Sequence, residues 1–119
     1  MPNKPLARWK TKQVVEKLRS IARDLQGLAT SIVRPESTAA AVASWHREVA
    51  GYLRDMSALV SGELSHSDAA LHQAEELRAC ADILTEWANH PTDRTGNHAR
   101  AAQLRGVAAG VLAFADKIQ

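Results

Sequence analysis

Apolar residues recur along the chain at alternating steps of four and three positions. The pattern is clearest between residues 6 and 34, where apolar side chains occupy positions 14, 18, 21, 25, 28 and 32. Such steps keep apolar side chains on one face of an α-helix and form a stripe that packs against another helix. Pro35 ends the stretch because it lacks a backbone N–H and disfavours helical geometry in the preceding residue. We therefore predict a first helix over about residues 6–34.

A second helix is predicted over about residues 36–61. Ser37 and Thr38 supply side chains that cap a helix N-terminus, and Gly62 is a typical stop. In this register His46 points away from the apolar stripe, so we expect it at the surface. The expected stripe consists of Val42, Trp45, Val49, Tyr52, Met56 and Leu59, widened by Leu53 and Val60.

Two further helices follow in the second half of the chain. The segment from Ser65 to Asp68 resembles a capping box that opens a third helix, which ends near Asn89 before Pro91. Asp93 offers a cap for a fourth helix that reaches nearly to Gln119. The expected buried positions are Leu77, Cys80, Leu84 and Trp87 in the third helix, and Ala101, Leu104, Ala108, Val111, Ala115 and Ile118 in the fourth.

The composition also favours helix. The chain has 22 alanines and 12 leucines against 8 valines and 4 isoleucines, and it has no alternating run flanked by a hairpin turn. We therefore predict an all-α fold, a four-helix bundle built from two tandem helical hairpins. The hairpins span about residues 6–61 and 66–118, form one domain over residues 6–119, and follow a flexible N-terminal arm of residues 1–5.

The two predicted hairpins resemble each other. A shift of 59 residues superimposes one on the other without a gap, with ten identities over 44 positions. This match indicates an internal duplication with pseudo-twofold symmetry. Gly51 and Gly110 are equivalent under the shift, and glycines inside helices are typical of close helix approach. The bulky stripe of the second helix also corresponds to a stripe of smaller residues in the fourth, so we expect these two helices to interdigitate across the core.

Charge is segregated along the chain. Residues 1–23 contain seven basic side chains and one acidic one, whereas residues 55–93 contain eight acidic side chains and one basic one. One interpretation places the first helix beside the third, with complementary charges. The other assigns the basic segment to contact with a protein or a nucleic acid. Because Trp9 lies among basic residues outside the clear stripe, the predicted contact residues are Arg8, Trp9, Lys10 and Lys12.

The sequence does not contain a recognisable catalytic or metal-binding motif. The five histidines do not form the paired Glu-x-x-His motifs of a carboxylate-bridged di-iron bundle, and His72 with its neighbouring glutamates is expected to be a solvated helix surface. Phosphate-cradling loops and nucleophile elbows are also missing. Cys80, the single cysteine, is expected to be a small buried hydrophobe, which fits a reducing compartment. We therefore expect no enzyme, cofactor or metal.

These observations predict a non-enzymatic protein that binds another protein, as a regulatory or accessory (bacterial or phage-type) factor or inhibitor in the cytoplasm. The alternative is a bundle that binds a small ligand or nucleotide, in which Arg19 and Arg78, equivalent under the duplication, contact an anion. Binding of nucleic acid by the basic segment is a third possibility, and the heptad stripes also permit a homodimer. The longest uncharged stretch near the C-terminus is half the length of a membrane span, and no leader opens the chain.

Overall fold

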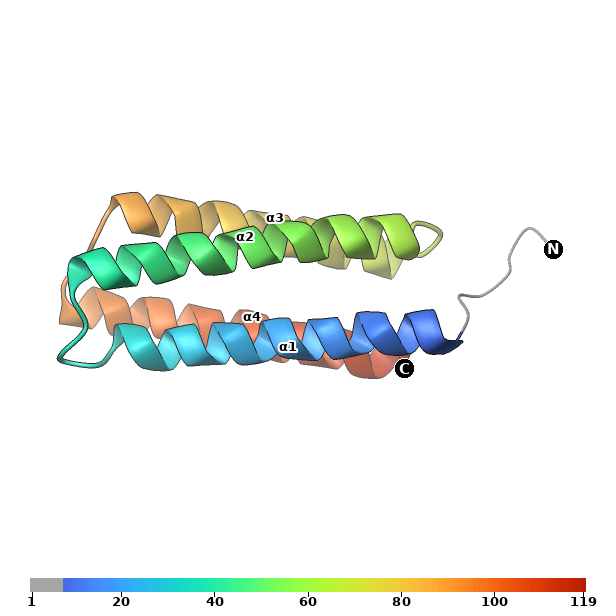
Figure 1. The fold of residues 1–119 in the computed structure, drawn as a ribbon, viewed down its shortest axis with the longest axis horizontal. Coiled ribbons are helices and arrows are strands. Elements are labelled where there is room, and N and C mark those ends of the chain that lie inside the picture. The colour runs from blue at the N-terminus through green and yellow to red at the C-terminus, as the bar shows by residue number, and fades with distance from the viewer. Residues whose placement is uncertain (1–7) are drawn as a thin grey trace.

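The computed structural model describes the backbone of residues 8–119 and the side chains from Lys10 onward, so the predicted arm of residues 1–5 lies outside the described residues. The described part contains four helices and no strand: α1 (Arg8–Ile32), α2 (Ala39–Glu63), α3 (Asp68–Asn89) and α4 (Arg94–Ile118). They alternate in direction along one bundle, so that the start of α1 and the end of α4 lie at the same end of it (Figure 1). The predicted all-α four-helix bundle is thus confirmed.

The starts of three helices are fixed by side-chain caps. Thr38 Oγ1 accepts a hydrogen bond of 3.1 Å from the backbone N–H of Ala41, and Ser67 Oγ accepts one of 3.2 Å from Ala70. At α4 the carboxylate of Asp93 accepts a 2.8 Å hydrogen bond from the N–H of Gly96. Each cap satisfies a backbone donor that has no partner within the helix, which is why the predicted starts lie within three residues of the observed ones.

The four helices form two closely packed antiparallel pairs. One layer consists of α2 and α3 and the other of α1 and α4 (Figure 1). Helices α1 and α2 adjoin less closely, and α3 and α4 approach each other least, whereas α1 and α3 lie diagonally across the core. The interpretation that placed the first helix beside the third is therefore wrong.

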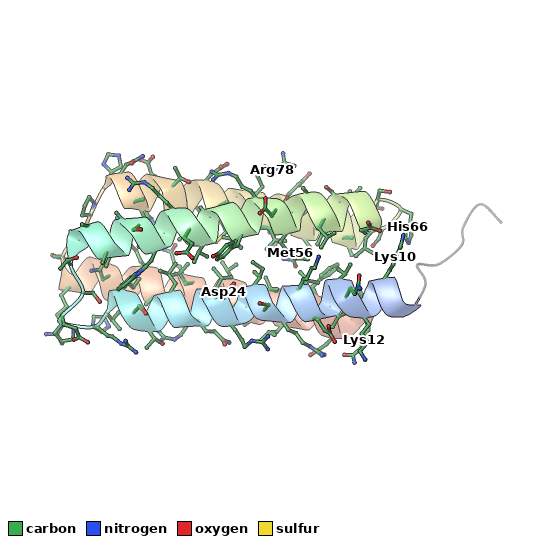
Figure 2. The ribbon with its side chains drawn as sticks, viewed as in Figure 1. Lys10, Lys12, Asp24, Met56, His66 and Arg78 are labelled. Carbon is green, nitrogen blue, oxygen red and sulfur yellow. The ribbon has the colours of Figure 1, made fainter. Side chains whose placement is uncertain are left out.

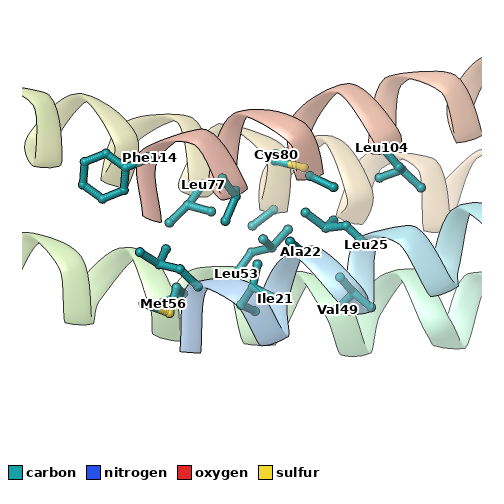
Figure 3. Packing of buried hydrophobic residues seen from close by; sticks show 14 of the residues in the cluster. Ile21, Ala22, Leu25, Val49, Leu53, Met56, Leu77, Cys80, Leu104 and Phe114 are labelled. Atoms are coloured by element: carbon teal, nitrogen blue, oxygen red, sulfur yellow. The ribbon is translucent and has the colours of Figure 1, made fainter. Parts of the chain in front are cut away.

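Small side chains explain which pairs pack closely. Buried alanines recur every seven residues on two helices, at Ala101, Ala108 and Ala115 of α4 and at Ala74, Ala81 and Ala88 of α3. Alanine brings the backbones of neighbouring helices close together, so α1 packs closely against α4 and α2 against α3. Larger side chains separate the two layers: Figure 3 shows Leu53, Leu25 and Leu77 in the middle of the core.

The buried face of α2 differs from the predicted one. Val49, Met56, Leu53 and Val60 are buried as expected, but the side chain of Tyr52 is 43% exposed, and Trp45 is only half-buried. Trp87 of α3 is likewise half-buried against the core. His46 is 0% exposed, so its predicted surface position is wrong. Helix α2 is rotated relative to the prediction, so that His46, Ala50 and Ser57 are buried against the neighbouring helices in place of Trp45 and Tyr52.

The structure supports the repeat in one half only. Burial along α1 and α3 follows the same register at the 59-residue offset, whereas Tyr52 is exposed and its counterpart Val111 in α4 is fully buried. The internal duplication therefore stays a prediction. The close helix approach expected at Gly51 and Gly110 is wrong, since a Cβ atom at either position would have no atom within 4 Å.

The layers also differ in charge. Helix α1 carries six basic and two acidic side chains, and α4 carries four basic and one acidic. Helix α2 carries two basic and three acidic side chains, and α3 carries one basic and five acidic. The layer of α1 and α4 is thus basic and the layer of α2 and α3 acidic, although the ion pairs that join helices in the described part of the chain, Arg19–Asp116 and Arg54–Asp82, each lie within one layer. None of the described helices has both the length and the hydropathy of a bilayer-spanning segment.

Candidate functional site

A furrow runs along the boundary between α1 and α2. Three adjoining hollows form it, with volumes of about 290, 410 and 260 Å³. The first two share Lys17 and Leu59, and the second and third share Asp24 and Tyr52. We call this surface the α1–α2 furrow. Its floor is apolar and consists of Val14, Ile21 and Leu28 from α1 together with Val49 and Met56 from α2.

The furrow exists because α1 and α2 do not pack as closely as the layer partners do. Bulky side chains such as Met56 and Tyr52 occupy the α2 edge, where the close pairs carry alanine. In Figure 2, Asp24 and Met56 lie between the two helices, in the middle of the furrow. The result is an open furrow with an apolar floor, charged edges and a large exposed aromatic at its centre, a composition typical of protein-binding surfaces.

Acidic groups surround the centre of the furrow. The hydroxyl of Tyr52 donates a 2.6 Å hydrogen bond to Glu48 Oε1, and this bond raises the pKa of Tyr52. Partial burial raises the pKa of Asp24 above its ordinary value, an effect that Arg23 opposes and Glu48 reinforces. Asp55 lines the same hollow. A cationic group of a ligand would therefore be favoured at the centre, since it would relieve the repulsion between these carboxylates.

The predicted N-terminal contact residues occupy different faces. Lys10 is exposed and lines the end of the furrow next to Lys17. Lys12 is also exposed but points away from α2 (Figure 2), as two residues apart on a helix face in nearly opposite directions. Arg8 and Trp9 begin α1, and the predictions made for their side chains lie outside the described residues.

The two arginines of the alternative ligand site are not brought together. Arg19 Nη2 pairs with Asp116 Oδ1 at 3.2 Å and donates a 2.6 Å hydrogen bond to Gln119 Oε1, both at the end of α4. Arg78 is exposed at the outer edge of α3 (Figure 2). Because α1 and α3 are diagonal, the two guanidinium groups do not converge on one anion.

Chemically reactive side chains do not gather in the described part of the chain. His72 Nε2 lies 3.0 Å from Glu76 Oε1 in an exposed pair on α3, and residues 8–119 show no group of three metal-ligating side chains. The burial predicted for Cys80 is confirmed, and it raises the pKa of the thiol to about 11. Since the thiolate is the nucleophilic form, Cys80 is poorly suited to covalent chemistry near neutral pH.

Sequence reasoning missed the centre of the furrow because it counted Tyr52 as a core residue. One signal could have corrected this: Glu48 lies four residues before Tyr52, on the same helix face, and supplies an exposed partner for the phenol. A buried tyrosine also needs a partner for its hydroxyl, which the predicted apolar stripe did not provide.

The architecture places the chain in the class of antiparallel four-helix bundles. No protein-family model, curated protein or solved structure was found to match it.

Proposed function

We propose that the protein is a non-enzymatic binding module that holds an amphipathic helix of a partner protein in the α1–α2 furrow. The observation that carries the proposal is the exposure of Tyr52 at the centre of a continuous furrow with an apolar floor and charged edges. A helix laid in such a channel buries its apolar stripe, and an aromatic side chain at the centre supplies large contact area at low cost in conformational entropy.

Charge along the furrow defines the partner segment further. The centre carries three carboxylates, from Asp24, Glu48 and Asp55, with Arg23 beside them. Lys17 lies between the centre and the end that carries Lys10 and Glu63. The proposed segment therefore has a basic residue flanking the middle of its apolar stripe and acidic residues at the end that lies over the two lysines. Lys10 is the one predicted contact residue with a described side chain that takes part in this arrangement.

Photocrosslinking in the native host tests this proposal. A photoreactive phenylalanine analogue replaces Tyr52 in one protein and Leu71 in another, because Leu71 is exposed to a similar extent, 38%, and does not line the furrow. We expect a specific protein adduct from position 52 that position 71 does not give. The crosslinked segment is then synthesised and titrated against the purified protein. We expect Tyr52→Ala to weaken its binding about tenfold or more.

Leu71→Ala serves as the matched control and should bind the segment as the wild-type chain does. Circular dichroism confirms that both variants remain helical. Equal affinities of Tyr52→Ala and Leu71→Ala for the crosslinked segment would show that the furrow is not the binding site.

The charge layering favours a second candidate function, nonspecific binding of nucleic acid by the basic layer of α1 and α4. Under this candidate, a generic DNA duplex binds at low salt, and the affinity falls steeply as salt is raised. Lys12→Glu should weaken binding because Lys12 is exposed on the basic layer, whereas Arg78→Glu on the acidic layer should not. Fluorescence anisotropy measures both, and absence of binding at about 25 mM salt would reject this candidate.

A further inference from the structure

One of the three hollows of the α1–α2 furrow has two aromatic side chains in its lining. It is the hollow of about 260 Å³ at the end away from Lys10, and both Trp45 and Tyr52 of α2 line it. The buried side chains of Leu28 and Val49 form its floor. We call it the aromatic hollow. Its volume is below the roughly 300–1,000 Å³ of sites for drug-sized ligands, so it suits a single side chain of a partner.

Two carboxylates line the same hollow from opposite helices. Asp24 belongs to α1 and lies between the two helices in Figure 2. Glu48 belongs to α2, where it is one turn from each of the two aromatic residues and accepts the hydrogen bond from Tyr52. Arg23 also lines the hollow, so these charged lining residues, two acidic and one basic, have a formal net charge of −1. One monovalent cation would neutralise it.

The two carboxylates lack a strong partner of their own. Neither Asp24 nor Glu48 forms an ion pair with a basic residue in the described part of the chain. Burial raises the pKa of Asp24 above its ordinary value, Arg23 opposes this rise, and the charge of Glu48 adds to it. Ionised Asp24 is therefore in an unfavourable environment, which a cation bound between the two carboxylates would relieve.

We propose that the aromatic hollow receives an arginine side chain of the partner helix, an inference that rests on the function proposed above. The planar guanidinium lies against the rings of Trp45 and Tyr52. Its N–H groups donate to Asp24 on the α1 side and to Glu48 on the α2 side. The apolar floor of the hollow contacts the methylene groups of the same side chain.

Arginine fits this hollow better than lysine. The guanidinium presents N–H donors along a flat edge, so it reaches acceptors on both helices while one face rests on an aromatic ring. It is also more weakly hydrated than an ammonium group and loses less on entering a hollow with an apolar floor. The chain contains a comparable contact elsewhere: the Arg100 guanidinium lies 5.0 Å from the centroid of the Trp87 ring while its Nη2 donates a 2.8 Å hydrogen bond to the carbonyl of His90.

Nuclear magnetic resonance titrations of the full chain with capped amino acids test the proposal. The probes are N-acetyl-arginine amide, N-acetyl-lysine amide and N-acetyl-citrulline amide, since citrulline keeps the shape of arginine without its charge. The indole N–H signal of Trp45, assigned by comparison with Trp45→Phe, reports binding. We expect saturation by the arginine probe with a Kd of about 10 mM or below, a Kd about threefold or more higher for the lysine probe, and no saturable shift with citrulline.

Filling the hollow separates binding from folding. Gly27 of α1 lines the hollow, and a Cβ atom added there would have no atom within 4 Å. Leucine is the better helix former, so the melting temperature of Gly27→Leu should not fall, whereas the Kd of the arginine probe should rise about tenfold or more. Gly51→Leu is the matched control, because Gly51 is equally open and does not line the hollow, and it should bind the probe as the wild-type chain does.

A second pair of variants tests the charge. Glu48→Gln removes the carboxylate but keeps an acceptor for the Tyr52 hydroxyl, so we expect the Kd of the arginine probe to rise about threefold or more. Glu75→Gln, at an exposed position of α3, should leave it unchanged.

Three results would overturn the arginine site. They are the absence of saturation up to about 50 mM, equal affinity for the arginine probe and either of the other two, and a Gly27→Leu protein that binds the probe as wild type does. Because the probes are single amino acids, their binding does not depend on a partner helix. A crosslink from position 52 together with any of these results would leave the helix in the furrow and remove only the arginine from the proposal.

Discussion

Replacing Ala108 with tryptophan is expected to lower the free energy of unfolding by about 3 kcal/mol. Ala108 is 0% exposed and belongs to the buried alanines of α4 that let α1 and α4 pack closely. An indole at this position has no free volume to enter, so it must push the two helices apart or force neighbouring side chains out of their preferred rotamers. Thermal unfolding followed by circular dichroism should show a melting temperature lower by roughly 10–20 °C.

The control for this prediction is the next residue. Ala109 is exposed on the same turn of α4, so Ala109→Trp adds the same side chain without burying it. We expect a change within about 0.5 kcal/mol for Ala109→Trp. Equal stability of the Ala108→Trp and Ala109→Trp proteins would contradict the close packing of α1 against α4.

The helices were predictable because local signals determine them. The proline at position 35 and the capping side chains of Thr38, Ser67 and Asp93 act on the backbone within a few residues, so the sequence places the helix ends almost correctly. Burial along α1 was likewise predictable, since its leucines and isoleucines leave one choice for the apolar face.

The orientation of α2 was not predictable from side-chain hydrophobicity. Two overlapping stripes share Val49 and Met56, and the aromatic residues favoured the wrong one. The structure favours the other because Ser57 and Ala50 are small enough for close packing, and the hydroxyl of Ser57 donates a 2.6 Å hydrogen bond to the carbonyl of Ala74 on α3. That contact joins residues on different helices, and helical periodicity within α2 carries no information about it.

The candidate furrow depends on the same rotation. Turning α2 toward α3 moves Tyr52 out of the core and onto the boundary with α1, where it meets Asp24. Charge counts along the chain located a basic segment over residues 1–23 but could not show that α1 and α4 form one layer. Close packing at the buried alanines determines which helices pair, because it stabilises the fold more than the weak attraction between exposed charges does.

His46 is the least expected member of the core. Its Nδ1–H donates a 2.6 Å hydrogen bond to the carbonyl of Val42, and its ring meets the edge of Trp87 with centroids 5.9 Å apart. Nε2 is buried without a hydrogen-bond partner. Burial lowers the pKa of His46 below its ordinary value of 6.5, the hydrogen bond to Val42 opposes this, and Arg100 adds to the lowering. The guanidinium of Arg100 lies 5.0 Å from the Trp87 ring centroid, on the α4 side of this cluster.

We therefore expect stability to fall as the pH drops below about 6.5. The unfolded chain protonates His46 near its ordinary pKa, whereas the folded chain resists protonation until a lower pH, so acid favours the unfolded state between the two values. Below the folded-state pKa this group causes no further loss. Urea unfolding at pH 7.5, 6.5 and 5.5 measures the effect on the free energy of unfolding.

His46→Leu isolates the contribution of this one side chain. Leucine fills most of the same volume and removes the unpartnered Nε2, so we expect stability within about 1.5 kcal/mol of wild type at pH 7.5 and a shallower decline toward pH 5.5. His46→Ala, which leaves a cavity, should instead cost about 3 kcal/mol at pH 7.5. The four exposed histidines cancel in the comparison between wild type and His46→Leu. Parallel pH profiles of those two proteins would show that His46 is not the group that makes the bundle sensitive to acid.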